Sequence, residues 1–332
     1  MNNKDFLYSR KWGVFIHYLE FNQNRDEEGN VISDWNTCTE ALDVELLAYQ
    51  LHKVNAGYLF FTMMQGFRYM AAPNDTFNKL TGFKPGEACC RRDVIEDLYC
   101  ALKKYDIPLF LYFTGDGPNR DEEMIDLFGI SRGYPNEHEE RFFKMWASVF
   151  EEYCVRYGDK VKGWWMDGMN FWYGYEKDEN LKLFVDAAKK GNPESLFAAN
   201  YYSVIHDGFN EYFEGVGEVP MGEFYHNICP PTKFCDFTAG ESNWFDMFTS
   251  KRFINGAQAH VLSFLGIPKH PMQVFGGWAS RGSKYSPEYM RKYVECMNQY
   301  GGVVTIDVHM DRKGNIDPDQ FKVLQEVGKI ER

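Results

Sequence analysis

The clearest indication of the fold is the stretch Lys162-Gly-Trp-Trp-Met-Asp-Gly-Met-Asn-Phe171. Its beginning, 161–165, has the apolar bulk of a buried strand and follows a long helical pattern that ends near residue 157. Asp167 comes at the end of this strand and Gly168 follows at once, a pair that also suits an ordinary turn. Two tryptophans precede the acid, and flat aromatic faces suit a sugar ring better than a turn. In a parallel barrel the active site lies at this end of the strands, so we predict that Asp167 is catalytic.

Strand and helix patterns alternate along the rest of the chain. Strands are expected at 12–19, 57–64, 107–113, 161–165, 196–202, 237–241, 259–265 and 303–308, with 224–225 as a rival for the sixth. Helices are expected at 42–54, 92–105, 139–157, 181–189, 286–300 and from 317 onward. Eight such units favour a (β/α)8 TIM-type barrel of the α/β class over an open sheet, in one domain spanning residues 1–332. No glycine-rich nucleotide or phosphate loop is present.

Composition narrows the class of protein. The chain has 332 residues, of which 44% are hydrophobic, and this is enough for one full core. A net charge of −12 argues against nucleic acid or an anionic membrane as partner. The eight cysteines form no C-x-x-C pair, and the histidines, including His206, His226, His260 and His270, show no metal-ligand spacing, so no metal or other cofactor is expected. The N-terminal residues lack the apolar core of a secretory signal, which predicts a cytoplasmic location.

Several segments, in this order and spacing, carry a resemblance to a known family. They are 11–17, 42–57, 92–114, 157–168 and 301–316. Over nearly its whole length the chain resembles the α-L-fucosidase family of retaining glycoside hydrolases, glycoside hydrolase family 29. The resemblance implies that Asp167 is the nucleophile, that Trp165 is its neighbouring aromatic residue and that His17 contacts the sugar. We expect no counterpart of that family's C-terminal β-domain in this chain.

One segment departs from the family. Where the family has Lys-His-His-Asp-Gly-Phe after its second strand, this chain has Thr62-Met-Met-Gln-Gly-Phe67. The paired histidines of the family hydrogen-bond fucose hydroxyls, whereas Met63 and Met64 cannot donate such bonds. We therefore expect a less polar wall at the end of the second strand, and a sugar that differs from fucose.

A retaining glycosidase also needs a second carboxyl group as acid/base. Glu241, at the end of the expected sixth strand, is preferred over Asp236, which lies at its start, and over Glu223. The further residues expected to contact or stack on the substrate are Trp35, Trp172, Tyr201 and Trp244.

Three functions remain open at this point. The first is an exo-acting retaining hydrolase of a glycoside resembling a fucoside. The second is a hydrolase of the same mechanism for another sugar, and the third is a sugar-binding barrel without catalysis. The sequence leaves the oligomeric state undetermined.

Overall fold

Eight parallel strands form the centre of the molecule. The structure is a computed structural model that describes residues 3–133, 136–201, 209–210, 226–227, 232–246, 248–249, 251–268 and 276–331. The parallel strands follow the order β5-β4-β3-β2-β1-β13-β12-β8, and the short β7 pairs antiparallel with β8. Their bounds are β1 (Trp12–Ile16), β2 (Leu59–Thr62), β3 (Leu109–Thr114), β4 (Val161–Asp167), β5 (Leu196–Ala199), β7 (His226–Asn227), β8 (Glu241–Ser242), β12 (His260–Phe264) and β13 (Val303–Val308). The small ribbons β6 (Phe209–Asn210), β9 (Phe248–Thr249), β10 (Phe253–Ile254) and β11 (Ala257–Gln258) lie outside this sheet.

The segment just before β8 links the two ends of the curled sheet. The backbone N–H of Asp236 donates to the carbonyl of Phe197 in β5 at 2.7 Å, and Phe237 pairs in parallel with Gln258. The sheet therefore has the TIM-type barrel arrangement that the alternating pattern predicts. The rival sixth strand at 224–225 lies outside the described residues.

The strand pleat divides the apolar side chains into two layers. One residue of each alternating pair faces the barrel interior, and this inner group includes Phe15, Phe60, Tyr112, Trp165, Ala198, Phe237, Ala239, Leu262 and Val303. Their neighbours along each strand pack in the larger cluster that joins the sheet to the helices. Because successive side chains of a strand point to opposite faces, the position of an inner residue fixes which later residues face inward at the C-terminal end.

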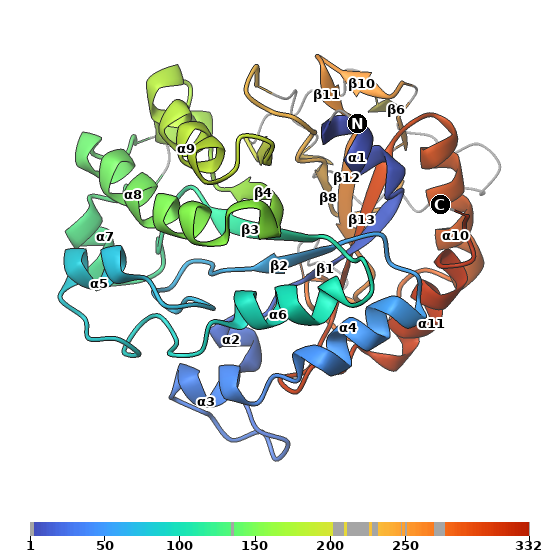
Figure 1. Cartoon of the computed structure of the whole chain (residues 1–332), viewed down its shortest axis with the longest axis horizontal. Coiled ribbons are helices and arrows are strands. Elements are labelled where there is room, and N and C mark those ends of the chain that lie inside the picture. The colour runs from blue at the N-terminus through green and yellow to red at the C-terminus, as the bar shows by residue number, and fades with distance from the viewer. Residues whose placement is uncertain are drawn as a thin grey trace.

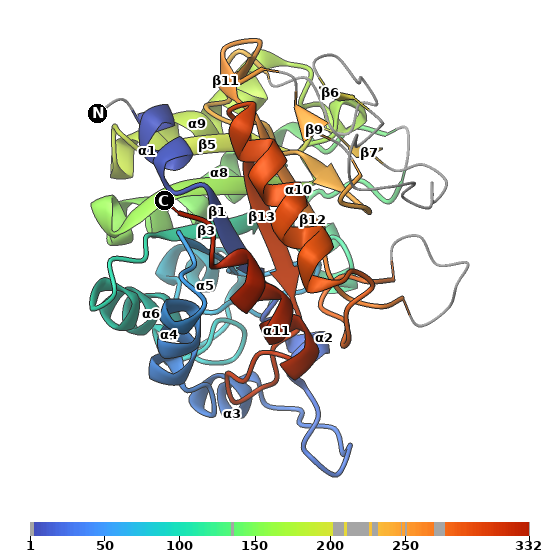
Figure 2. The same cartoon turned by 90° about the vertical axis from the view of Figure 1, so that its right-hand side faces the viewer.

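Helices surround the outside of the sheet (Figure 1), and in Figure 2 two of them, α10 and α11, lie over β12 and β13. The predicted helices appear as α4 (Val44–Lys53), α6 (Val94–Lys103), α8 (Glu140–Tyr157), α9 (Asp178–Gly191), α10 (Pro287–Gln299) and α11 (Pro318–Val327). The expected start of α10 is confirmed, because the Ser286 hydroxyl accepts the backbone N–H of Tyr289 at 3.2 Å. Short helices that the sequence pattern did not indicate are α1 (Asn3–Ser9), α2 (Glu20–Gln23), α3 (Trp35–Glu40), α5 (Asp75–Thr81) and α7 (Glu122–Phe128).

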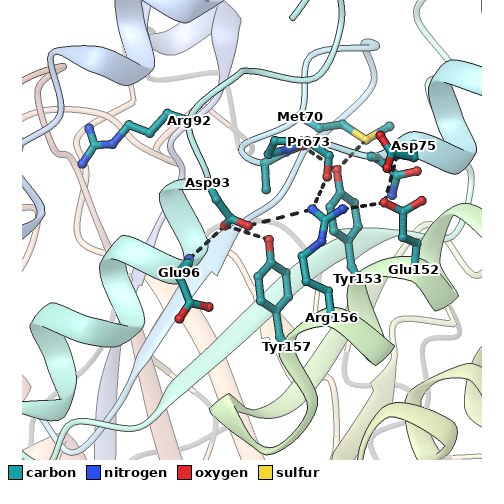
Figure 3. Close-up of polar contacts among 12 residues, drawn as sticks. Met70, Pro73, Asp75, Arg92, Asp93, Glu96, Glu152, Tyr153, Arg156 and Tyr157 are labelled. Atoms are coloured by element: carbon teal, nitrogen blue, oxygen red, sulfur yellow. Dashed lines mark hydrogen bonds and ion pairs between the residues drawn. The ribbon is translucent and has the colours of Figure 1, made fainter. Parts of the chain in front are cut away.

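A polar network on α8 ties the long loop after β2 to the barrel (Figure 3). Arg156 donates to the carbonyl of Pro73 and to Glu152, the latter at 2.6 Å, and it lies 3.9 Å from Asp93. Asp93 also accepts the Tyr157 hydroxyl at 2.9 Å. We call Asp93, Glu152, Arg156 and Tyr157 the Arg156 cluster. Its charges are opposite and in contact, so it stabilises the packing of α6, α8 and this loop.

Candidate active site

A cavity of about 400 Å³ opens at the C-terminal ends of the strands. Its wall includes two carboxylates, Asp167 from the last position of β4 and Glu241 from the first position of β8. The other residues that line it are Phe15, His17, Phe21, Asn22, Gln65, Tyr112, Arg120, Trp165, Leu262, Trp278 and Ala279. This is the end of a barrel where loops converge and where substrates bind in enzymes of this fold.

The strand pleat brings Asp167 into the cavity. Trp165 points into the barrel, so Asp167, two residues later, points the same way just beyond the apolar interior. Three neutral donors fix its carboxylate: the Tyr112 hydroxyl at 2.7 Å, the Asn200 side-chain amide at 3.0 Å and the backbone N–H of Gly168 at 2.9 Å. Tyr112 stacks on Trp165, with ring centroids 5.4 Å apart, so its hydroxyl is held in place. Burial and the nearby Asp167 raise the pKa of Tyr112 well above its usual value, so its hydroxyl stays protonated and donates.

Glu241 reaches the same place by the same rule. Phe237 and Ala239 face inward, and Glu241 follows in phase with them. The Asn200 side chain, which is fully buried, donates from one nitrogen to Asp167 and to Glu241. Because one amide nitrogen reaches both carboxylates, their nearest oxygens lie within about 6 Å of each other. We call Tyr112, Asp167, Asn200 and Glu241 the Asp167 cluster.

His17 continues the inward row of β1 and its ring is oriented by an acid on β13. Its Nδ1 donates to Oδ1 of Asp307 at 2.6 Å, and Asp307 is completely buried. The second oxygen of Asp307 accepts the backbone N–H of Ala279 at 2.8 Å. Since Nδ1 is engaged, Nε2 is the ring atom left for a ligand in the cavity that His17 lines.

A third acid, Asp116, lies behind the nucleophile candidate. Its carboxyl packs against the Cα of Gly168, where an added Cβ would come within 2.3 Å of Asp116 Cγ, and its Oδ2 accepts the Asn119 side-chain amide at 2.5 Å. Withdrawal from water, followed by the negative charge of Asp167, raises the pKa of Asp116 to about 8. Asp116 is therefore protonated at neutral pH and does not add a second charge beside Asp167.

The two methionines of the departing segment do not line the cavity. The pleat of β2 sends Phe60 inward and Leu59 and Phe61 outward, and Met63 continues the outward row. Met64 is also fully buried and accepts the Thr114 hydroxyl at 3.2 Å. The expected position of both side chains in the wall of the site is wrong, and Gln65 occupies that wall instead.

Of the aromatic candidates, only Trp165 lines the cavity. Trp35 is buried outside the barrel, and its indole N–H donates to the carbonyl of Met70 at 2.8 Å. Trp172 and Tyr201 pack beside Phe171, and their ring centroids lie 4.8 and 6.0 Å from the centroid of the Phe171 ring. These three side chains are not brought to the site that Asp167 occupies.

Trp244 follows Glu241 in the chain, but its ring packs against the ammonium group of Lys284. The ammonium of Lys284 lies 4.0 Å from the centroid of the Trp244 ring and donates to the carbonyl of Asn243 at 2.6 Å. Desolvation lowers the pKa of Lys284 to about 7. Trp244 is thus part of the packing that holds the loop after Glu241, outside the cavity wall.

The rival acids occupy different places. Asp236 accepts Lys189 and the backbone N–H of Phe197, both at 3.1 Å, at the start of the segment that leads to Glu241. It is remote from the cavity wall, in agreement with its position at the wrong end of the expected strand. Glu223, and the histidines His206 and His270, lie outside the described residues, as does the side chain of His226.

The polar residues that sequence reasoning missed include three that bind the side chains of Asp167 or His17, namely Tyr112, Asn200 and Asp307. Tyr112 and Asn200 each follow an inward-facing residue by two positions, Phe110 and Ala198, and Asp307 is four positions after the inward-facing Val303. All three stand near the C-terminal ends of their strands. A count of strand parity would have found all three, because polar residues at such positions face the mouth of a barrel.

No group of three or more His, Cys, Asp or Glu side chains is arranged to hold a metal ion in the described ranges. In the same ranges, no helix has the length and apolar character needed to cross a lipid bilayer.

No protein-family model and no curated protein sequence matches this chain. Solved structures do resemble it in fold. The endo-fucoidan hydrolase MfFcnA4 of glycoside hydrolase family 107 has a TM-score of 0.66 at 13% identity, and the match covers 98% of this chain and 53% of that one. The α-L-fucosidase AlfC from Lactobacillus casei, in complex with α-L-fucose product, has a TM-score of 0.64 at 13% identity, covering 99% and 98%.

A family 29 α-L-fucosidase from Bacteroides thetaiotaomicron gives a TM-score of 0.62 at 13% identity, covering 98% of this chain and 72% of that one. This chain thus spans about half the length of MfFcnA4 but almost the whole of AlfC. At such low identity the likeness establishes the shared barrel fold: this chain is built like the catalytic barrels of fucosidases and fucoidan hydrolases.

Proposed function

We propose that this protein is a retaining exo-glycoside hydrolase that acts on a fucose-related substrate. The observation that carries the proposal is the Asn200 amide, which hydrogen-bonds both Asp167 and Glu241 inside one cavity. The separation of about 5–5.5 Å used by retaining enzymes fits this arrangement, whereas inverting enzymes need roughly 6.5–9.5 Å to admit a water molecule. The barrel likeness to fucosidases supports the class of substrate.

In the first step Asp167 attacks the anomeric carbon while the bond to the leaving oxygen breaks. Glu241 donates a proton to that oxygen, and a covalent glycosyl-enzyme forms. In the second step Glu241 takes a proton from water, which attacks the same carbon and releases Asp167 as the free carboxylate. Tyr112 and Asn200 hold Asp167 at both oxygens, so little reorientation is needed before attack.

His17 and Trp165 supply the binding surface in this proposal. His17, oriented by Asp307, presents Nε2 to a sugar hydroxyl, and Trp165 presents an apolar face at the base of the cavity. Gln65 takes the place that the sequence assigned to two methionines, so this part of the wall has amide donors and acceptors. The argument for a sugar other than fucose, which depended on an apolar wall here, therefore loses its basis.

The test begins with the stereochemistry of turnover. Proton NMR of 4-nitrophenyl α-L-fucoside during hydrolysis should show α-L-fucose as the first-formed product. β-L-Fucose appearing first would contradict the double displacement. A parallel panel of other aryl glycosides identifies the preferred sugar, and a preference for any of them over the fucoside would overturn the proposed substrate class.

The acid/base role is tested separately with Glu241→Ala. An acid matters most when the leaving group is poor and least when it is a nitrophenol. The variant should lose about a hundredfold or more in kcat/KM on an alkyl fucoside and far less on the nitrophenyl one. Added azide should give a fucosyl azide of retained configuration. Equal losses on both substrates, without azide rescue, would remove Glu241 from this role.

A further inference from the structure

Arg120 is a cation in the wall of the acidic cavity that the proposed reaction does not use. Its side chain is exposed and lines the cavity together with Gln65, Phe21 and Asn22. Within the described part of the chain, no acidic side chain is within ion-pair distance of its guanidinium, and the guanidinium makes no hydrogen bond there. Arg68 lies in a neighbouring hollow that Arg120 also lines, and unlike Arg120 it forms ion pairs, with Asp121 at 2.6 and 2.5 Å and with Glu123 at 2.7 Å.

Packing, rather than charge, holds Arg120 in place. Its backbone N–H donates to the carbonyl of Gly66 at 2.8 Å. Its side-chain stem lies on Gly66, where an added Cβ would come within 2.8 Å of Arg120 Cδ, and Gly66 has a φ of +71°. The guanidinium carbon is 5.9 Å from the centroid of the Phe21 ring. The stem is thus fixed while the N–H groups of the guanidinium remain available.

The topology separates Arg120 from the acid/base candidate. Arg120, Gln65 and Phe21 belong to the segments that follow β3, β2 and β1, whereas Glu241 comes from β8. β8 is separated from β1 in the sheet by β12 and β13. A ligand in the cavity therefore meets the carboxylates at the ends of β4 and β8 and the cation beside the loops after β1 to β3. The positive charge acts on this region, because it lowers the otherwise raised pKa of Asp116.

We propose that Arg120 forms a subsite for an oxyanion substituent of the glycan, such as a uronic carboxylate, a sulfate ester or a phosphate. The proposal rests on the proposed function only in placing a glycan in this cavity. A guanidinium offers a planar pair of N–H donors that matches these groups, and such charge-assisted bonds are stronger than neutral ones. A chain of net charge −12 would repel an anionic glycan elsewhere, so a free arginine here selects for its binding at this place.

Calorimetric titration at low salt tests the subsite with paired probes. D-Galacturonate is compared with D-galactose, and a sulfated L-fucose with L-fucose; inorganic sulfate is titrated alone. At least one anionic sugar should bind about tenfold more tightly than its neutral partner. Arg120→Gln should abolish that preference, and Arg120→Lys should retain part of it because a point charge keeps attraction but not the two-donor fork. Lys292→Met, which removes an exposed charge from α10, is the matched control and should leave the preference unchanged.

The outcomes separate this subsite from the proposed hydrolysis. The sugar pair that shows the preference identifies the group as a carboxylate or a sulfate ester. Equal affinity for charged and neutral sugars, a preference that survives in Arg120→Gln, or inorganic sulfate binding as tightly as the sulfated sugar would each overturn the subsite. If no glycoside is hydrolysed but the Arg120-dependent preference is present, only the proposed catalysis fails. If hydrolysis occurs without the preference, only the subsite fails.

Discussion

The Asp167 cluster and the Arg156 cluster are both polar groups built on strand ends and helices, but they differ in charge balance. Arg156 lies between Glu152 and Asp93, so each charge of that cluster contacts an opposite one. Asp167 is held by a phenol, an amide and a backbone N–H, all of them neutral. Contacts between opposite charges stabilise the packing of a fold, whereas a carboxylate that accepts hydrogen bonds from neutral donors has no opposite charge in contact with it among the described residues. In the proposed reaction the transition state carries positive character, which a carboxylate of this kind would stabilise.

The largest expected effect on turnover comes from removing the charge of Asp167. Asp167→Asn is nearly isosteric, and the fold should remain, but loss of the proposed nucleophile should lower kcat/KM on an aryl fucoside by at least about a thousandfold. Asp159→Asn changes the same charge at an exposed position before β4 and should leave turnover unaffected. A folded Asp167→Asn protein with more than about a tenth of wild-type turnover, equivalent to only about 1.4 kcal/mol of barrier, would remove Asp167 from the mechanism.

Asn200 tests whether the neutral bridge between the carboxylates matters. Asn200→Ala leaves Asp167 and Glu241 without their shared donor, so both acids lose alignment, and we expect a fall in kcat/KM of about a hundredfold. The matched control is Asn298→Ala, since Asn298 donates to two carbonyls, those of Lys11 and Gly302, at the opposite end of the barrel. Both variants should lose stability in urea denaturation, but only Asn200→Ala should lose turnover. Similar kinetic losses in the two would indicate a merely structural role.

Substitution of Arg156 should lower the stability of the fold and leave turnover unchanged. Arg156→Met removes the cation from two partly buried acids that keep other donors, so the free energy of unfolding should fall by about 2 kcal/mol. Its kcat/KM should not change at temperatures where the protein is folded. Lys144→Met breaks an exposed pair with Glu140 on the same helix and should lower the free energy of unfolding much less than Arg156→Met does. A kinetic defect in Arg156→Met would show that the two clusters are coupled.

A separate prediction concerns the pH dependence of stability and the carboxyl group of Asp116. Its pKa is raised from 3.8 to about 8 in the folded chain, so between these values the unfolded state releases this proton first. Unfolding therefore becomes easier as pH rises through this window, and Asp116→Asn, which has no proton to release, escapes that loss. The Tm of the variant relative to wild type should increase from pH 5 to pH 8. A difference in Tm that is constant over this range would show that Asp116 does not hold a proton.

The sequence alone predicted the order of the strands and helices, and it predicted two of the acids that line the cavity, Asp167 and Glu241. β13 has the bounds that were predicted, Val303–Val308. The sixth strand was expected at 237–241 but appears as β8, Glu241–Ser242, and Phe237 makes only an isolated bridge, so those expected bounds are wrong. Asp167 was a candidate because a carboxylate at the end of a buried apolar run is hard to explain by packing. Glu241 was a candidate because of its place at the end of the expected sixth strand. Both line the cavity. The short helices α2, α3, α5 and α7 escaped because four to seven residues are too few to show a helical period.

Which side chains line the cavity became evident only from the tertiary structure. Met63 and Met64 follow a strand as closely as Gln65 does, yet the pleat and the packing of the loop bury the first two and expose the third to the cavity. Asn200 and Asp307 acquire their roles from partners 33 and 290 residues away in the chain, and Arg120 from the missing side chain of Gly66. A local sequence pattern sets where a strand begins and ends. Which distant polar groups meet at its end depends on the closure of the barrel, because that closure brings together strand ends that no local pattern relates.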